Sequence, residues 1–114
     1  MTDEQIARAL HEVLRAHNLA HDDDSLPPWE EAHDWQHAAS LEAVSFHKAN
    51  PDASPEQTHE AWAAEKRANG WSYGPVKNAE TRSHPMLVPY DELPAHEKAK
   101  DYIAAAIVRA LVTT

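Results

Sequence analysis

The residues best suited to chemistry lie on one predicted helix, where His59, Trp62 and Lys66 are spaced three and then four residues apart. Residues with this spacing fall on the same side of an α-helix, so these side chains share one face. An indole can stack on a planar ring, an ammonium can pair with a phosphate, and an imidazole can donate a hydrogen bond. The face is a candidate binding surface for a flat, anionic ligand. The alternative is that Trp62 fills the core while His59 and Lys66 lie at its rim.

More aromatic and basic residues follow this helix directly. Gly70 and Gly74 bracket Trp71 and Tyr73 and permit sharp turns with close backbone approach. In an extended segment the two aromatic side chains point to the same side, either as a second wall of a pocket or as anchors of a loop. Arg67 could bind a phosphate through its fork, whereas loop cations could surround an anion or remain solvated. The candidate ligand-binding residues are Trp62, His59, Lys66, Arg67, Trp71, Tyr73, Lys77 and Arg82.

Three further residues of the loop are interpreted as structural. His84 precedes Pro85, which restricts the backbone of the preceding residue, so His84 is expected to hold the loop through hydrogen bonds. Tyr90 and Asp91 are expected to attach the loop to the last helix.

No arrangement typical of catalysis or metal binding accompanies these residues. The chain has no cysteine, no nucleophile elbow and no glycine-rich phosphate loop. His17 and His21, like His33 and His37, are four residues apart, but zinc needs three or four converging ligands and no third is evident. We therefore expect a protein that is not an enzyme and that has no cofactor and no metal.

Composition limits the class of partner. With 114 residues and 42% hydrophobic residues, the chain is expected to form a single domain over residues 1–114. A net charge of −9 opposes binding to a nucleic acid polymer, because the phosphate backbone is repelled. The sequence shows neither a signal peptide nor a membrane-spanning run, so we expect a cytoplasmic protein without a membrane partner.

Hydrophobic periodicity predicts four helices. They are expected over residues 3–17, about 28–49, from Pro55 to Asn69–Gly70, and about 94–112, with capping boxes at Thr2 and Ser54. The second helix has apolar residues on two sides, which predicts a central position. The predicted inward residues of the first and last helices are Ile6, Leu10, Val13, Leu14 and His17, and Ala99, Ile103, Ala106, Ile107 and Ala110.

The predicted fold is mainly α: a small single-domain bundle of about four helices. A long ordered loop, residues 71–93, separates the last two helices, and its short extended pieces at 71–73 and 86–88 could pair. A loop of this length is often functional when it is ordered.

The segment from His59 to Asp101 resembles the RyR domain, the repeat module of ryanodine receptors. The motifs that carry the resemblance are His59 to Trp62, Gly70 to Gly74, His84 to Tyr90, and Glu92 to Pro94. The upstream PPWEEAHDW segment and the HKANP helix end resemble stand-alone bacterial and phage members. The resemblance extends over about residues 3–112.

The resemblance implies a small helical module and an adenine-nucleotide ligand. In ryanodine receptors the modules form tandem pairs whose cleft holds such nucleotides, and the tryptophan of that site corresponds to Trp62. This chain has one module, so a comparable cleft would require a homodimer, unless the pocket lies within one module. Nucleotide sensing or sequestration is the first expected function. The alternative is a protein-interaction or assembly module that binds no small ligand.

Overall fold

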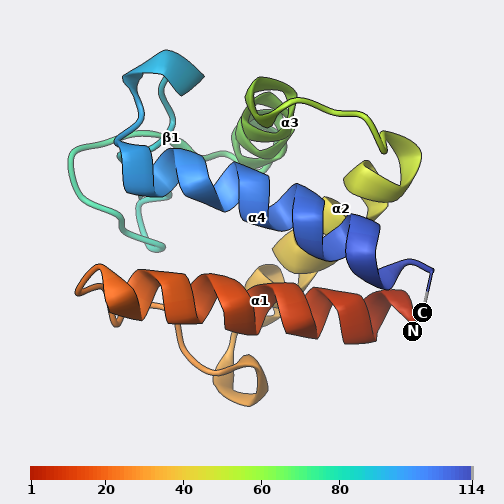
Figure 1. Cartoon of the computed structure of the whole chain (residues 1–114). Helices are drawn as coiled ribbons and strands as arrows, with labels where there is room; N and C mark the ends of the chain where they lie inside the picture. Colours follow the sequence, from red (N-terminus) through yellow and green to blue (C-terminus); the bar gives the residue numbers. More distant parts are fainter. Residues whose placement is uncertain (114) are drawn as a thin grey trace.

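The computed structural model describes residues 1–113 and has four α-helices, two short 3-10 helices and one pair of short strands (Figure 1). The α-helices are α1 (Asp3–Ala20), α2 (Asp34–Ala49), α3 (Pro55–Ala68) and α4 (Ala95–Leu111). The 3-10 helices are η1 (Trp29–Glu31) and η2 (Tyr90–Glu92), and the strands are β1 (Ser72–Tyr73) and β2 (Ser83–His84). The predicted class, a mainly α bundle with short strands between its last two helices, is confirmed.

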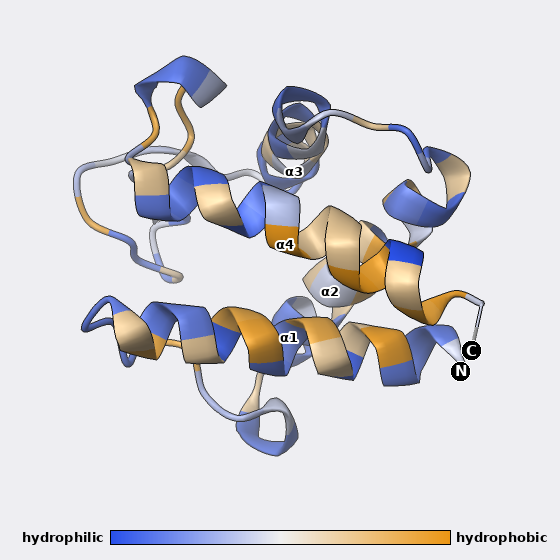
Figure 2. Ribbon diagram, viewed as in Figure 1, coloured by the Kyte–Doolittle hydropathy of each residue, from blue (hydrophilic) through white to orange (hydrophobic). Residues whose placement is uncertain are grey.

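The main core lies where α1, α2 and α4 meet. α1 and α4 run side by side in opposite directions, and both pack against α2 (Figure 1). Figure 2 shows apolar residues along the lengths of both α1 and α4. α3 packs on α4 from the other side, and its contact with α2 is slight. A first apolar cluster consists of Ile6, Ala7, Trp29, Val44 and Val108. A second consists of Ala63, Trp71 and Leu87, with Trp62 at its edge.

Local capping explains where two of the helices begin. The side chains of Thr2 and Ser54 accept the backbone N–H of Gln5 and Gln57, which return a bond to each cap, as the sequence predicts. The predicted start of the second helix at residue 28 is wrong, because residues 29–31 form η1 instead. There the N–H of Trp29 is bonded to the carboxylate of Glu12, and its buried indole packs on α1.

The inward faces differ in part from the prediction. On α1, Val13 is exposed, whereas the polar Asn18 is buried. On α4, Ala106 and Ala110 are exposed, and the buried stripe runs through residues 104, 105 and 108. Alanine spacing alone misplaced this face, because small residues fit on either side of a helix. The central position predicted for α2 is also wrong, because its buried residues form one stripe and α4 is the helix that packs on the other three. The buried residues of α2 are Gln36, Ser40, Val44 and His47.

The loop between α3 and α4 is held by a short parallel pairing. Ser72 is opposite Ser83 and Tyr73 is opposite His84, so residues 86–88 do not supply the second strand. Gly74 makes the close approach possible, since a Cβ on it would lie 2.6 Å from the Cβ of Ser83. Gly70, with a φ of +85°, ends α3 in the left-handed conformation that glycine favours.

Candidate functional site

A cavity of about 740 Å³, partly open to solvent, lies between α2 and α3 and is bordered by α1, α4 and the loop. The two helices run in opposite directions along it. Lys66 near the end of α3 meets Trp35 at the start of α2, and the start of α3 lies beside the end of α2. Their slight mutual contact leaves room for the cavity. The fold therefore produces a hollow within a single chain.

Six of the eight predicted site residues line this cavity. They are His59, Trp62, Lys66, Trp71, Lys77 and Arg82. Arg67 and Tyr73 are not in the lining and are exposed to solvent. Arg67 is one residue beyond Lys66, which turns it about 100° around the helix. Tyr73 is 61% exposed while Trp71 is buried, so the prediction that these two aromatic side chains point to the same side is wrong. Trp71 lies before the strand, and its backbone N–H donates to the carbonyl of Lys66 at the C-terminus of α3.

The predicted face of α3 joins the helix to the loop. His59 is 3% exposed, and its Nε2–H donates to the carbonyl of Val88 at 2.7 Å. Its ring stacks on Trp62 with centroids 5.4 Å apart, and the ring of His84 meets Trp62 edge-on at 5.0 Å. Trp62 is half-buried and still lines the cavity. His59 thus has a structural role, whereas Trp62 combines packing with access to the hollow.

Lys66 lies against two indoles. Its ammonium is 4.7 Å from the ring centroid of Trp35 and 4.5 Å from that of Trp71, within the range of cation–π attraction. Burial, with a smaller contribution from Lys77, lowers the pKa of Lys66 to about 8. Trp35 was not expected at the site. No local signal could have placed it there, because it is on another helix 31 positions earlier in the chain.

Three lysines from different elements converge on His84, which lines the same cavity. Burial, followed by the charges of Lys77, Lys66 and Lys100, lowers the pKa of His84 to about 3. Lys100 was missed by sequence reasoning, because on α4 it reads as an ordinary surface lysine paired with Glu97, whose carboxylate is 2.7 Å away. Like charges gathered at one wall favour an anion there.

Acidic residues face the same cavity on α4. Asp101 lines it beside Glu97, and burial together with the charge of Glu97 raises the pKa of Asp101 to about 7. The lining also includes Glu42 and Glu65, so acidic side chains accompany the basic ones around the cavity.

Arg82 has a structural explanation. Its Nη1 donates to the carbonyl of Asn69 at 2.6 Å, at the C-terminus of α3, and its own φ is +53°. The structural interpretation of His84 is confirmed in geometry, since its Nδ1 accepts the N–H of Met86 at 3.1 Å. Tyr90 is buried, with the ammonium of Lys98 from α4 5.2 Å from its ring, while Asp91 is exposed.

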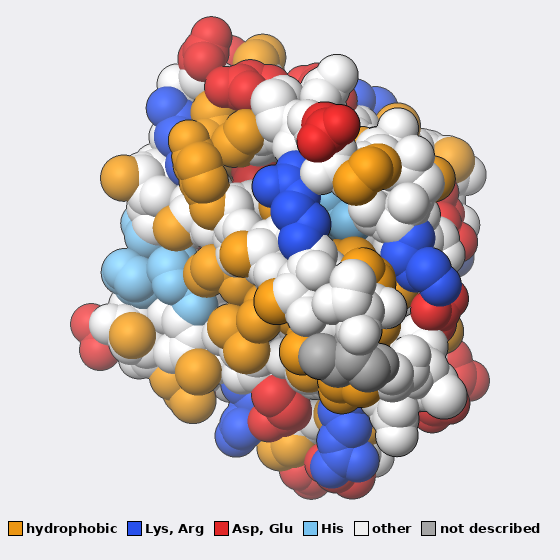
Figure 3. All heavy atoms as spheres, turned by 45° about the vertical axis from the view of Figure 1, so that its right-hand side comes forward, with side chains coloured by type: hydrophobic (Ala, Val, Ile, Leu, Met, Phe, Trp, Pro, Cys, Tyr) orange, Lys and Arg blue, Asp and Glu red, His pale blue; other side chains and the backbone are white. Residues whose placement is uncertain are grey.

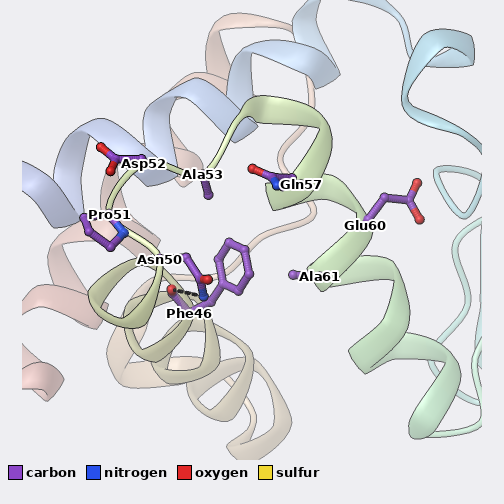
Figure 4. Close-up of a pocket in the computed structure, with 8 residues that line it drawn as sticks. All are labelled: Phe46, Asn50, Pro51, Asp52, Ala53, Gln57, Glu60 and Ala61. Atoms are coloured by element: carbon purple, nitrogen blue, oxygen red, sulfur yellow. Dashed lines mark hydrogen bonds between the residues drawn. The ribbon is translucent and has the colours of Figure 1, made fainter.

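A second hollow of about 610 Å³ lies where α2 passes into α3 (Figure 4). It is more open to solvent than the cavity. Phe46 projects from α2 toward Ala61 of α3, and both residues also line the cavity, so they separate the two hollows. The lining contains Asp52 and Glu60 and no lysine or arginine. An anionic ligand is therefore better matched by the cavity.

Histidine side chains gather on one face of the molecule (Figure 3). The ring of His21 lies 4.5 Å from that of His17 and 5.1 Å from that of His96, measured between centroids. Within residues 1–113, however, no group of three or more His, Cys, Asp or Glu side chains is placed to hold a metal ion. No helix among these residues is both long and apolar enough to cross a membrane.

The family model of the RyR domain matches residues 32–113. The match spans α2, α3, the loop and α4, which include Trp62 and the three lysines around His84. This chain belongs to the RyR domain family. α1 precedes the matched region, but its Ile6 and Ala7 pack in the same apolar cluster as Val44 and Val108.

Proposed function

We propose that this protein is a non-enzymatic module that binds an adenine nucleotide, or a signal derived from one, in the cavity between α2 and α3. The observation that carries the proposal is the convergence of Lys66, Lys77 and Lys100 on a cavity wall beside Trp62. Its role would be to sense or sequester the ligand in the cytoplasm of a bacterial or phage-infected cell. This setting rests on the resemblance to stand-alone family members.

The dimensions of the cavity support a small-molecule ligand. A volume of about 740 Å³ lies within the usual range of 300–1,000 Å³ for such sites. The lining combines aromatic and aliphatic side chains with a few charged ones, as is typical of pockets that orient a ligand. In this arrangement the base stacks on Trp62, and the phosphates lie toward Lys66, Lys77 and Lys100.

The cavity is formed by one chain, so this proposal needs no second copy to complete it. A homodimer remains compatible with the proposal, but it would have another purpose than building the pocket.

Calorimetry with a panel of adenine and other nucleotides tests the proposal, using wild-type protein and Trp62→Ala. Stacking contributes about 1–3 kcal/mol per base, so Trp62→Ala should weaken binding by about tenfold or more. Tyr73→Ala is the matched control, because Tyr73 is an aromatic residue of the same region outside the cavity lining. Circular dichroism checks that both variants fold. Unchanged affinity in folded Trp62→Ala would remove the proposed role of this residue.

A protein-interaction module is the second candidate. It is favoured by exposed Tyr73, Val76 and Tyr102, which are 61%, 70% and 62% exposed. Light scattering with and without nucleotides distinguishes the two candidates. A ligand-independent oligomer that binds no nucleotide of the panel supports assembly, and product formation during long incubation would instead reveal an enzyme.

A further inference from the structure

His84 uses one of its two ring nitrogens to hold the loop between α3 and α4. The backbone N–H of Met86 donates to Nδ1 of His84 at 3.1 Å, so Nδ1 carries no proton. Burial, followed by the charges of three lysines, lowers the pKa of His84 to about 3, and the ring is therefore neutral at physiological pH. In a neutral imidazole with an unprotonated Nδ1, the proton is on Nε2. The loop thus fixes the tautomer of His84.

The Nε2–H of His84 is a donor without an acceptor in the protein. Within residues 1–113 this atom forms no hydrogen bond, and it is not closed to solvent as the ring nitrogens of His47 are. His84 lines the cavity. A protonated ring nitrogen cannot coordinate a cation, because its lone pair belongs to the ring. The group that this nitrogen can bind is a hydrogen-bond acceptor.

The imidazole is held in place before any ligand arrives. The backbone of His84 belongs to β2 and pairs with Tyr73 of β1. The ring meets Trp62 edge-on, with centroids 5.0 Å apart, and lies tilted against Trp71 at 6.2 Å. A donor that is already ordered loses little conformational freedom on binding, which favours affinity.

Lys77 is placed near this donor by the turn between the strands. Lys77 precedes Asn78, which pairs with Ser83, the residue before His84. The charge of Lys77 is the largest of those that act on the imidazole. Within residues 1–113 Lys77 forms no salt bridge. Its ammonium is therefore available to an anion.

Two further lysines reach the same ring from α3 and α4. The ammonium of Lys66 is 4.5 Å from the ring centroid of Trp71, the indole that also contacts His84. Among the described residues Lys66 has no salt bridge, whereas Lys100 is paired with Glu97 at 2.7 Å. An acceptor that comes to Nε2–H is thus favoured when it carries negative charge.

We propose that the Nε2–H of His84 donates a hydrogen bond to a phosphate oxygen of the bound nucleotide. The inference rests on the proposed function and adds a neutral ligand-binding residue to its lysines. An ammonium on a flexible stem attracts phosphate as a point charge, whereas a fixed N–H requires an oxygen at one place. The lysines offset the charge of the phosphate, and His84 sets its position. The subsite should accept the phosphate of a nucleotide and also free polyphosphate.

Two substitutions separate the roles of the two ring nitrogens. In His84→Asn the amide oxygen takes the place of Nδ1 and can still accept the N–H of Met86, but the Nε2–H donor is lost. In His84→Gln the longer side chain brings an amide N–H near the former position of Nε2, but the bond to Met86 is lost. His96→Asn is the matched control, because it changes an exposed histidine outside the cavity lining.

Calorimetry with ATP, tripolyphosphate and adenosine measures the effect of each substitution. A hydrogen bond to a charged group is worth enough that His84→Asn should bind ATP and tripolyphosphate about tenfold more weakly than the wild type. His84→Gln should lose less affinity than His84→Asn, although thermal denaturation should show it to be the less stable of the two. Adenosine has no phosphate, so its affinity should be equal in all of these proteins.

Nuclear magnetic resonance of the histidine ring nitrogens gives a readout that a purely structural role of His84 would not change. At neutral pH without ligand, Nε2 of His84 should be protonated and Nδ1 should not. Addition of tripolyphosphate should shift the Nε2 resonance more than that of Nδ1. If His84→Asn does not fold, this measurement on the wild type decides, and an Nε2 resonance unchanged by saturating tripolyphosphate overturns the inference.

The outcomes distinguish this inference from the proposed function. A wild type that binds ATP, with equal affinity in folded His84→Asn, would overturn the inference and leave the proposed function standing. Tripolyphosphate binding that depends on His84, without binding of any nucleotide, would support the inference and overturn the nucleotide ligand. A wild type that binds neither ATP nor tripolyphosphate would overturn both.

Discussion

At Lys66, attraction to two aromatic rings is opposed by the free-energy cost of burying a charged ammonium. Its ammonium is attracted by two indoles but loses much of its hydration, and its pKa falls from 10.5 to about 8. The unfolded chain therefore holds this proton more tightly than the folded chain does. The contribution of Lys66 to the free energy of unfolding therefore rises with pH between about 8 and 10.5. Below that window, the full cost of burying the charged ammonium lowers the stability of the folded chain.

An anionic ligand should reverse this shift. Binding next to Lys66 favours its charged form, so its pKa should rise on addition of ATP, and ATP affinity should fall as pH increases through about 8. Nuclear magnetic resonance of the lysine Cε groups measures both states directly. The Lys66→Met variant should lose this pH dependence and bind ATP about tenfold more weakly. A pKa that is the same with and without bound ATP would place the phosphates elsewhere.

Asp101 provides a second prediction at this scale. Its folded pKa of about 7 exceeds the ordinary 3.8, so its contribution makes the protein less stable as pH rises from about 4 to 7. Asp101→Asn should therefore stabilise the protein at pH 8, by about 1–2 kcal/mol once solvent screening is discounted, and hardly at pH 4. Urea denaturation at the two pH values measures the difference. Equal effects at both would contradict a raised pKa.

The part of the site that a sequence can reveal is the part borne by one helix. Helical spacing brought His59, Trp62 and Lys66 to one face, and all three line the cavity. Trp35 and Lys100 come from α2 and α4, and only tertiary packing brings them to this cavity.

At the level of elements, the loop between α3 and α4 depends most on contacts between residues that are distant in the sequence. Capping boxes at Thr2 and Ser54 could be predicted because their bonds are local. The partner of β1 could not, since two-residue strands carry no periodicity and the pairing depends on the turn between them. η1 could not be predicted for the same reason. Its first residue, Trp29, donates its backbone N–H to the carboxylate of Glu12 on α1, a contact that the local sequence does not reveal.

Gly74 is predicted to be essential to this loop. A methyl group on it would meet the Cβ of Ser83 at 2.6 Å, so Gly74→Ala should destabilise the protein by about 1–3 kcal/mol. Thermal or urea denaturation gives the value. Adding Ser83→Gly removes the clashing atom and should restore part of the loss. A double variant no more stable than Gly74→Ala would show that the strands do not approach this closely.

At the scale of the whole molecule, α4 joins two parts of the protein. It packs with α1 and α2 around the main core and with α3 beside the second cluster. Between α2 and α3 the packing is incomplete, and the cavity occupies that space. The family resemblance could predict the helices and the loop. Because the modules of ryanodine receptors are paired, it also suggested a binding cleft between two copies of this chain. The lining of this cavity comes from side chains of several elements, so the cavity could not be predicted from the sequence.

Stoichiometry follows from a cavity contained in one chain. Titration with ATP should give one ligand per chain, and sedimentation should show that binding does not require a dimer. One ligand per two chains, with affinity that depends on protein concentration, would instead support a cleft between copies.

The most direct measurement is a crystal structure of the protein grown or soaked with ATP. Our account predicts the nucleotide between α2 and α3, with its base against Trp62 and its phosphates beside His84 and the surrounding lysines. Electron density for ATP at an interface between two chains, or a nucleotide-free cavity filled by its own side chains, would contradict it.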